Sequence, residues 1–162
     1  MIRMVSYNVN GIRAAFQKGF VDWLKDAAPD ILCIQETKAL KDQVDHTLLS
    51  DLGYSQYWFS AEKRGYSGVL ILSRIVPDRV EYGMQMPPYD SEGRLIRFDF
   101  GDLTLVNVYV PSGTQGGIRQ EFKMKFLGDF QQYMNLLKKE RPQLIVTGDF
   151  NIHGSPGNIP GA

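Results

Sequence analysis

The sequence is poor in cysteine and histidine, with one cysteine, Cys33, and two histidines, His46 and His153, among its 162 residues. A single cysteine cannot form an internal disulfide, so we expect a reducing intracellular compartment such as the cytoplasm. The histidines are well separated, so the sequence holds no zinc-ligand cluster, and it has no Walker-type glycine pattern either. Disulfide-rich, zinc-dependent and P-loop proteins are therefore excluded as classes.

An excess of charge of either sign is also absent, because 18 Lys and Arg residues balance 18 Asp and Glu residues. The whole-molecule field therefore gives no indication of a nucleic-acid partner, although this balance is compatible with a local basic face. No stretch approaches the roughly 18 uninterrupted apolar residues of a membrane span. Residues Met1–Val5 lack the basic segment, apolar run and cleavage site of a secretory signal. We expect no membrane partner, and the partner has to be inferred from motifs.

Hydrophobic residues make up 43% of the chain and aromatic residues 12%, which are ordinary values for a globular domain. A single domain of this length buries roughly 68–70% of the surface that its unfolded chain exposes. We therefore expect a hydrophobic core that needs no disulfide or structural metal to be stable. The last residues, 154–162, are rich in Gly and Pro, and we expect them to form a flexible tail behind a domain that spans residues 1–153.

Hydrophobic patterning in the first third of the sequence predicts alternating strands and helices. Residues Ile2–Tyr7 alternate between apolar and polar side chains and lead into a turn at Asn8–Gly11, which predicts a strand. Apolar residues recur at helical spacing over Phe16–Ala27 and again over Val44–Leu52. Between these two predicted helices, the short apolar run Ile31–Ile34 predicts a strand that is buried on both faces. The first third is therefore expected to run strand, helix, strand, helix.

The middle of the chain has a different pattern, with strand-like runs separated by Gly, Pro and Asp. These runs are Tyr54–Ser60, Gly68–Ser73, Leu95–Phe100 and Leu103–Val110. We expect antiparallel pairing here, with Gly101-Asp102 as a hairpin turn. A helical stripe of apolar residues then covers Arg119–Arg141, and a last strand is expected at Leu144–Thr147. Strands and helices in this order predict a layered α/β fold.

Residues with useful chemistry end the apolar strands or follow directly after them. These residues are Asn8, Glu36, Tyr109, Asp149 and Asn151. Strand ends of a layered α/β protein are where side chains project from a rigid sheet into a common crevice. Each residue also has a purely structural explanation: the asparagine and aspartate as turn residues, the glutamate as an acid at a helix N-terminus, the tyrosine as a strand aromatic. The shared position at strand ends is what favours a site.

Together these side chains provide the groups that Mg²⁺-assisted hydrolysis of a phosphodiester requires. Mg²⁺ prefers oxygen ligands and often binds through only one or two carboxylates, completed by water and phosphate, which suits Glu36 with Asn8. Asp149 is the candidate that orients or deprotonates an attacking water. The Tyr109 hydroxyl and Asn151 are candidates to hydrogen-bond phosphate oxygens as charge builds up on them.

Six motifs occur in one order along residues 1–151. They are Ser6-Tyr7-Asn8-Val9-Asn10-Gly11-Ile12-Arg13-Ala14, Gln35-Glu36-Thr37-Lys38, Gly65-Tyr66-Ser67-Gly68-Val69, Glu92-Gly93-Arg94, Tyr109-Val110-Pro111-Ser112-Gly113 and Gly148-Asp149-Phe150-Asn151. In this order they resemble the exonuclease III class of abasic-site endonucleases, within the endonuclease/exonuclease/phosphatase superfamily. One such motif would be weak support, whereas six in register over almost the whole chain are strong support.

The resemblance implies a fold, a cofactor and an activity. The fold is the front part of a four-layer αββα sandwich, in which helices flank two mixed β-sheets. The cofactor is Mg²⁺ or Mn²⁺, and the reaction is hydrolysis of DNA on the 5′ side of an abasic site, 3′–5′ exonuclease activity, or both. The implied partner is abasic duplex DNA, which suits a cytoplasmic, nucleoid-associated location or another reducing compartment.

The resemblance also implies roles for individual residues. Glu36 matches the principal metal ligand, with Asn8 beside it. Tyr109 matches a catalytic phosphate contact, and Asp149 matches the carboxylate that activates water at the metal. Asn151 matches a contact to the metal site or to phosphate. The residues implied to contact substrate phosphate or DNA are Asn10, Arg13 and Asn151.

The family pattern continues beyond the last motif to a late strand with a Ser-Asp-His sequence that completes the active centre. This chain has no counterpart of that sequence after Asn151. We therefore expect the 162-residue chain to be an incomplete domain with little nuclease activity as it stands. We also expect strands such as Gly68–Ser73 and Leu103–Val110 to expose apolar surface that the missing part would cover, which predicts self-association.

Two other functions are compatible with the sequence. One is a non-catalytic fragment or interaction module that keeps phosphate-binding loops without turnover. Its basic side chains would be Lys63, Arg64, Arg94, Arg97 and Arg119. The other keeps the superfamily and changes the substrate to an inositol-phosphate or sphingolipid phosphodiester. The segments Asn10–Arg13 and Pro111–Gly113 resemble the DNA-repair branch, which favours DNA.

Overall fold

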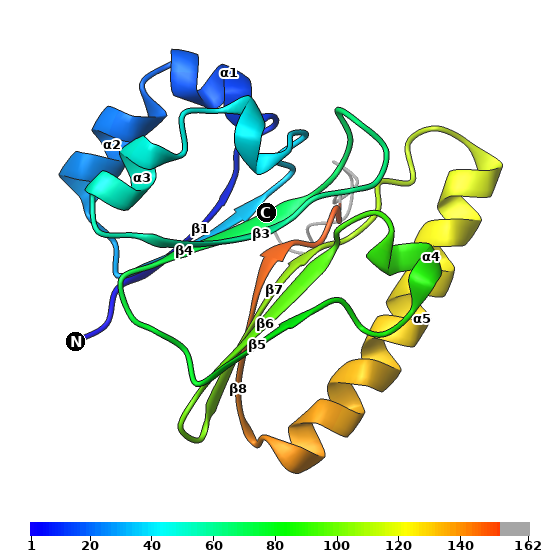
Figure 1. Cartoon of the computed structure of the whole chain (residues 1–162). Helices are drawn as coiled ribbons and strands as arrows, with labels where there is room; N and C mark the ends of the chain where they lie inside the picture. Colours follow the sequence, from blue (N-terminus) through cyan, green and yellow to red (C-terminus); the bar gives the residue numbers. More distant parts are fainter. Residues whose placement is uncertain (153–162) are drawn as a thin grey trace, which may run out of the picture.

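Two β-sheets packed face to face form the centre of the fold, and helices cover both outer faces (Figure 1). The structure is a computed structural model that describes residues 1–152. The flexible tail predicted for residues 154–162 and the adjacent His153 lie outside the described residues. The layers of helices, sheet, sheet and helices confirm the αββα arrangement expected from the resemblance.

The first sheet has a parallel pair at one edge and antiparallel pairs elsewhere. It contains, in spatial order, β1 (Met4–Asn8), β2 (Ile31–Gln35), β4 (Val69–Ser73) and β3 (Ser55–Phe59). β1 pairs parallel with β2, whereas β4 pairs antiparallel with both β2 and β3. Every residue of β2 and β4 is buried, because these central strands are covered on both faces.

The second sheet repeats this mixture of pairings. It contains, in spatial order, β5 (Arg79–Tyr82), β6 (Leu95–Phe100), β7 (Leu103–Tyr109) and β8 (Gln143–Asp149). β5, β6 and β7 are antiparallel, which confirms the prediction for the middle of the chain, and β7 pairs parallel with β8. The predicted hairpin is also confirmed, because Gly101-Asp102 joins the paired residues Phe100 and Leu103.

Helices cover the outer face of each sheet. The first sheet carries α1 (Ile12–Gln17), α2 (Phe20–Ala27), the 3₁₀ turn η1 (Lys41–Gln43) and α3 (Thr47–Asp51), and the second carries α4 (Pro87–Asp90) and α5 (Gly117–Glu140). The helix predicted over Phe16–Ala27 is interrupted, because Gly19 adopts a left-handed conformation with φ +93° between α1 and α2. Within residues 1–152, none of these helices combines the length and apolar character needed to cross a membrane.

Three clusters of buried hydrophobic side chains fill the three spaces between the four layers. One joins the first sheet to its helices and includes Leu24, and another joins the second sheet to α5 and includes Phe126. The third lies between the sheets, where Phe98 and Leu105 from the second sheet meet Ile71 from the first. These interfaces hold the strand ends at fixed positions, which is the structural basis of the site described below.

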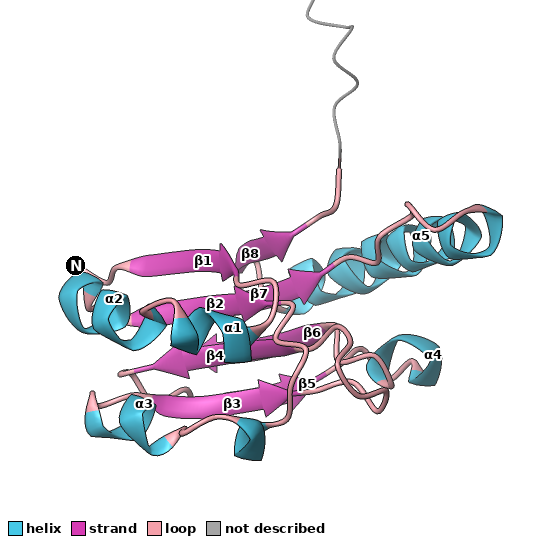
Figure 2. Ribbon diagram, turned by 90° about the horizontal axis from the view of Figure 1, so that it is seen from above, coloured by secondary structure: helices cyan, strands magenta, loops and turns pink. Residues whose placement is uncertain are grey.

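Within residues 1–152, β1 and β8 are edge strands of their sheets and lie against each other on the same side of the sandwich (Figure 2). The prediction that Gly68–Ser73 and Leu103–Val110 expose apolar surface is wrong. These segments form the central strands β4 and β7, which are buried between the opposite sheet and the outer helices. Exposed apolar side chains occur elsewhere, and two of them lie on the edge strands β1 and β8, with Tyr7 43% exposed and Ile145 38% exposed.

Candidate active site at the strand ends

The C-terminal ends of β1, β2, β7 and β8 meet at one end of the sandwich. The parallel register places Asn8 beside Gln35 in the first sheet and Tyr109 beside Asp149 in the second. β1 and β2 contact β8, and β2 also contacts β7, so the two pairs of strand ends face each other. The structure therefore brings together residues that lie up to 141 positions apart in the sequence.

Hydrogen bonds connect the predicted site residues in pairs that cross from one sheet to the other. The Asn8 Nδ2 amide donates to Asp149 Oδ2 at 2.6 Å, and the Tyr109 hydroxyl donates to Glu36 Oε1 at 2.8 Å. The other Asp149 oxygen, Oδ1, accepts the backbone N–H of Asn151 at 2.9 Å. The Asn151 side chain donates to the Val110 carbonyl at 2.6 Å, next to Tyr109. All five residues predicted at strand ends thus belong to one cluster.

Strained backbone positions gather around this cluster. Asn10, Glu36, Lys38 and Asn151 all have left-handed φ values, between 47° and 60°. For a residue other than glycine this conformation is uncommon and costs of order 1–3 kcal/mol, and it persists only where the surrounding structure enforces it. Such positions concentrate at functional sites, and no hydrophobic pattern in the sequence reveals them.

The Tyr109 hydroxyl is held in its neutral form. Burial raises the pKa of Tyr109, and the hydrogen bond to Glu36 and the charge of that carboxylate raise it further. The opposing effects of the Arg94 charge and of a hydrogen bond with Asn151 are smaller, so the pKa lies well above its usual range. At neutral pH the phenol is therefore a hydrogen-bond donor, suited to a negatively charged oxygen.

A basic rim borders the cluster on the side of the first sheet. Lys38 Nζ donates to Asn10 Oδ1 at 2.8 Å and lies 3.5 Å from Glu36 Oε2. Arg13 Nη2 donates to the Lys38 carbonyl at 3.3 Å, so two of the three predicted DNA contacts, Asn10 and Arg13, lie beside this lysine. Lys38 was not among the predicted site residues, although it belongs to the Gln35-Glu36-Thr37-Lys38 motif.

The oxygen atoms of this cluster suit a hard divalent cation. Glu36 has a largely buried side chain, 16% exposed, and shares the cluster with the Asp149 carboxylate and the amide oxygen of Asn8. The Asn8 oxygen also accepts the backbone N–H of Asn10 at 2.9 Å, which fixes the amide. In the part of the chain that the structure describes, no three His, Cys, Asp or Glu side chains form a common ligand group. This donor set matches Mg²⁺ or Mn²⁺, which bind through few carboxylates and keep several waters.

The alternative of a phosphate-binding module named five basic residues, and two of them, Arg94 and Arg97, are not available at the surface. They are 2% and 7% exposed, and their guanidinium groups pair with Glu92 and Asp99 at 2.7 and 2.8 Å. Arg119 also pairs with Glu92, at 3.2 Å. Buried and paired guanidinium groups cannot meet a phosphate at the surface. The exposed side chains of this group are Lys63 and Arg64.

Two buried amide side chains cross-link the sheets directly behind the site, and the sequence did not indicate them. Gln35 Nε2 donates to Asn107 Oδ1 at 2.9 Å, and Asn107 Nδ2 donates to the carbonyls of Ile34 and Leu70 at 3.1 and 3.2 Å. Gln35 precedes Glu36, and Asn107 lies two residues before Tyr109. These bonds fix the two sheets to each other next to the site residues. In the sequence, Gln35 and Asn107 could be recognised only as polar residues within apolar strands.

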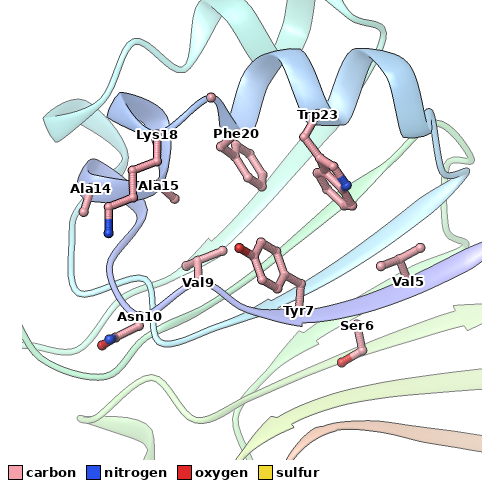
Figure 3. A pocket seen from close by; sticks show the side chains of 11 residues that line it. Val5, Ser6, Tyr7, Val9, Asn10, Ala14, Ala15, Lys18, Phe20 and Trp23 are labelled. Atoms are coloured by element: carbon pink, nitrogen blue, oxygen red, sulfur yellow. The ribbon is translucent and has the colours of Figure 1, made fainter.

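A pocket of about 540 Å³ opens beside the cluster, between β1 and helices α1 and α2 (Figure 3). Its wall contains the rings of Tyr7 and Trp23, whose centroids are 5.7 Å apart, together with Phe20. Asn10 borders both this pocket and the cluster, but no carboxylate lines the pocket. The chemistry therefore belongs to the strand ends, and the pocket is an apolar recess next to them.

Comparisons with known proteins agree with this arrangement. Residues 5–161 match the Endonuclease/Exonuclease/phosphatase family. The chain is 37% identical over 153 residues to the DNA repair nuclease APEX1 of Danio rerio and 36% identical over 152 residues to an exodeoxyribonuclease of Bacillus subtilis, with 93% of this chain covered in each case. Among solved structures, an AP endonuclease from Archaeoglobus fulgidus matches 96% of this chain with a TM-score of 0.80 and 30% identity. A 3′ phosphatase from Neisseria bound to product DNA matches with a TM-score of 0.83 and 25% identity.

The chain spans only part of each of these proteins. It covers 49% of the Danio relative, 59% of the Bacillus relative and 60% of both solved chains. The matched part includes all the strand ends that form the cluster.

Proposed function

The chain belongs to the Endonuclease/Exonuclease/phosphatase family, and we propose that its strand-end cluster is the metal- and phosphate-binding part of a DNA-repair phosphodiesterase. The reaction is hydrolysis of DNA on the 5′ side of an abasic site, with 3′–5′ exonuclease activity as a second capability. The observation that carries this proposal is the pair of cross-sheet contacts, Asn8 to Asp149 and Tyr109 to Glu36. Relatives named as an AP endonuclease and an exodeoxyribonuclease support the choice of DNA as substrate.

The family is one of metal-dependent nucleases, and we propose Mg²⁺, or Mn²⁺ in its place, for this chain. Glu36 and Asn8 would hold the cation, with Asp149 and Asn151 at its border. When bound, such a cation supplies charge stabilisation to a phosphate oxygen and to the leaving oxygen. The contact from Lys38 Nζ to the second Glu36 oxygen, at 3.5 Å, keeps this carboxylate from being an isolated buried charge.

The side chains of this chain would then bind the phosphate and move one proton. Asp149 accepts the proton of an attacking water, and the Asn8 amide fixes the carboxylate for this task through the 2.6 Å bond. The neutral Tyr109 hydroxyl gives its single hydrogen to Glu36 in the structure, and in the proposed complex it turns this hydrogen to a phosphate oxygen as negative charge develops there. Asn10, Arg13 and Lys38 form the adjoining rim, where DNA phosphates would lie.

A second candidate is a non-catalytic module that binds DNA phosphates without turnover. The observation in its favour is the share of the relatives that the chain covers, 49% to 60%. The two candidates differ in one measurable property, because only the first predicts Mg²⁺-dependent bond cleavage that depends on Glu36 and Asp149.

The test is incision of a duplex that contains one abasic analogue, in Mg²⁺ or in EDTA. The chain is assayed alone and fused to the C-terminal part of the Bacillus subtilis exodeoxyribonuclease. We expect the fused chain to incise only with Mg²⁺, and the chain alone to act at least about 10²-fold more slowly, because a site that lacks one group contacting the transition state loses about this much rate.

Matched substitutions identify the residues responsible. Glu36→Ala and Asp149→Asn are expected to lower incision by the fused chain by about 10²–10⁴-fold. Glu62→Ala and Asp102→Asn replace exposed acids elsewhere on the surface and are expected to leave the rate unchanged. DNA binding without incision by the fused chain would favour the non-catalytic module, and incision that survives Glu36→Ala would refute the proposed site.

A further inference from the structure

Two of the six sequence motifs have no part in the chemistry described above. These are Glu92-Gly93-Arg94 and Gly65-Tyr66-Ser67-Gly68-Val69. In the structure both meet behind Tyr109. Arg94 directly precedes β6, and because β6 runs antiparallel to β7, it lies across from the end of β7, where Tyr109 stands. The motifs therefore surround a residue of the site without contacting the site's carboxylates.

Arg94 holds Tyr109 by its main chain and by its ring. The Arg94 carbonyl accepts the Tyr109 backbone N–H at 2.8 Å, and Arg94 Nη1 donates to the Tyr109 carbonyl at 3.2 Å. The guanidinium carbon lies 4.9 Å from the centre of the Tyr109 ring, within the range of a cation–π contact. The Tyr109 hydroxyl donates to Glu36 Oε1 at 2.8 Å, so the main chain, the ring and the hydroxyl of this tyrosine each have a partner.

Arg94 is itself held by partners that use almost its full donor capacity. Arg94 Nε and Nη2 donate to Glu92 Oε2 at 3.0 and 2.7 Å, and Nη2 also donates to the Tyr66 hydroxyl at 3.0 Å. Arg119, from the first turn of α5, bonds to the same two acceptors, Glu92 and Tyr66. The planar fork of an arginine makes these contacts at once, whereas the single ammonium of a lysine cannot.

Gly93 explains how the chain reaches this position. Its φ is +59°, and a Cβ atom there would lie 2.3 Å from the Phe59 carbonyl oxygen, which is too close for any side chain. The glycine thus lets the segment before β6 pass close to the end of β3, which brings Glu92 and Arg94 next to Tyr66. The Glu92-Gly93-Arg94 motif therefore places the Arg94 side chain against Tyr109.

We propose that Arg94 is the positioning residue of Tyr109: it fixes the main chain and ring of this tyrosine so that its hydroxyl is held at the site, beside Glu36. The phosphate contact of Tyr109 rests on the proposed function, whereas the fixed ring is a property of the chain alone. The two can therefore fail separately in an experiment.

The test observes the Tyr109 ring directly. The 162-residue chain is labelled with 3-fluorotyrosine, and the ¹⁹F resonance of Tyr109 is identified by its absence in Tyr109→Phe. We expect Arg94→Met and Arg94→Lys to shift or split this resonance. The control is Arg141→Met, because Arg141 also donates to a carbonyl of β7, that of Leu103 at 3.3 Å, but at the opposite end of the strand.

The outcomes decide the proposal in either direction. A Tyr109 resonance that does not move in the Arg94 variants, or that moves equally in Arg141→Met, would overturn it. If Arg94→Met does not fold, Tyr66→Phe removes one acceptor of Arg94 and leaves the arginine in place. A smaller shift of the Tyr109 resonance is then expected, and no shift would overturn the proposal.

A second measurement separates this inference from the proposed function. Single-turnover incision of the abasic duplex by the fused chain is expected to fall by about 10²-fold in Arg94→Met and in Tyr109→Phe. The double variant should differ from Tyr109→Phe by less than about 2-fold, because both changes remove the same contact. Additive losses would show that Arg94 does not act through Tyr109. If the unsubstituted fused chain does not incise, the proposed function fails and the ¹⁹F result still decides the role of Arg94.

Discussion

Glu36 shows how much of the site is set at the scale of a single residue. Its backbone lies in the left-handed region at φ +60°, one carboxylate oxygen accepts the Tyr109 hydroxyl, and the other lies 3.5 Å from Lys38 Nζ. Both oxygens are therefore oriented before any ligand arrives, which is what a precise metal or phosphate site requires. The strain of this backbone, of order 1–3 kcal/mol, has to be offset by the surrounding fold.

The sequence predicted which residues would meet at the site but not how they are held there. Asn8, Glu36, Tyr109, Asp149 and Asn151 could be chosen because each ends or follows an apolar strand. Buried polar partners could not be chosen in this way. The Gln35 and Asn107 side chains meet across 72 positions of sequence. Nothing within either strand indicates that the other amide is its partner.

Cys33 provides a prediction at the residue scale. It is fully buried between the sheets, and burial raises the pKa of its thiol to about 12. Because the folded-state pKa lies above the unfolded value, the native state binds the proton more tightly, and stability falls as pH rises from about 9 towards 12. We expect almost no labelling by a thiol reagent at about pH 8 in the native chain and full labelling in urea. Labelling of the folded chain at the rate of the unfolded chain would contradict this burial.

At the scale of the elements, the strands and helices with a strong hydrophobic pattern were the ones that the sequence predicted well. The apolar runs of β2, β4, β6 and β7 and the long stripe of α5 gave strands and a helix close to those observed. The short elements β5 and α4 were missed, because four-residue elements owe their shape to partners elsewhere. In α4, for example, the Tyr89 hydroxyl donates to Asp129 Oδ2 of α5 at 2.5 Å, 40 positions away in the sequence. Such tertiary contacts are not visible in the hydrophobic periodicity of the segment.

The end of β8 depends on Gly148, which has φ +145° and precedes Asp149. A Cβ atom at this position would lie 1.9 Å from the Val108 carbonyl oxygen. We expect Gly148→Ala to force β8 away from β7, to lower the free energy of unfolding by about 1–3 kcal/mol or more, and to displace Asp149 from Asn8. Urea unfolding measures the first effect, and Mg²⁺-dependent incision by the fused chain measures the second.

Gly128 provides the matched control for this substitution. It lies exposed within α5, and a Cβ atom there would have no atom within 4 Å apart from the backbone of the helix itself. Gly128→Ala is expected to raise the free energy of unfolding by about 0.5–1 kcal/mol, because alanine favours a helix more than glycine does. Equal effects of the two glycine substitutions would contradict the close approach of β8 to β7.

At the scale of the whole molecule, the side of the sandwich where the edge strands β1 and β8 meet is the feature that bears on association. β1 and β8 lie side by side, each paired on one side within residues 1–152. An apolar recess of about 230 Å³ between the sheets on this side is lined by Ile2, Met4 and Ile145, among others. Unpaired edges next to exposed apolar side chains are templates for pairing with another chain.

We propose that the 162-residue chain associates with itself through these edges. Sedimentation equilibrium is expected to show a mass that rises with protein concentration. Ile145→Lys, which places a charge on the β8 edge, is expected to shift the chain towards the monomer, because an edge lysine opposes strand pairing. A monomer at all concentrations, for both the unsubstituted chain and Ile145→Lys, would refute this proposal.

Mn²⁺ binding measured by electron paramagnetic resonance tests most directly whether the strand-end cluster holds a divalent cation on Glu36, on which the proposed function depends. We expect one Mn²⁺ site per chain that Mg²⁺ displaces, that is lost in Glu36→Ala and that persists in Glu62→Ala, an exposed glutamate away from the cluster. Equal Mn²⁺ binding by Glu36→Ala and Glu62→Ala would contradict a cation site on Glu36.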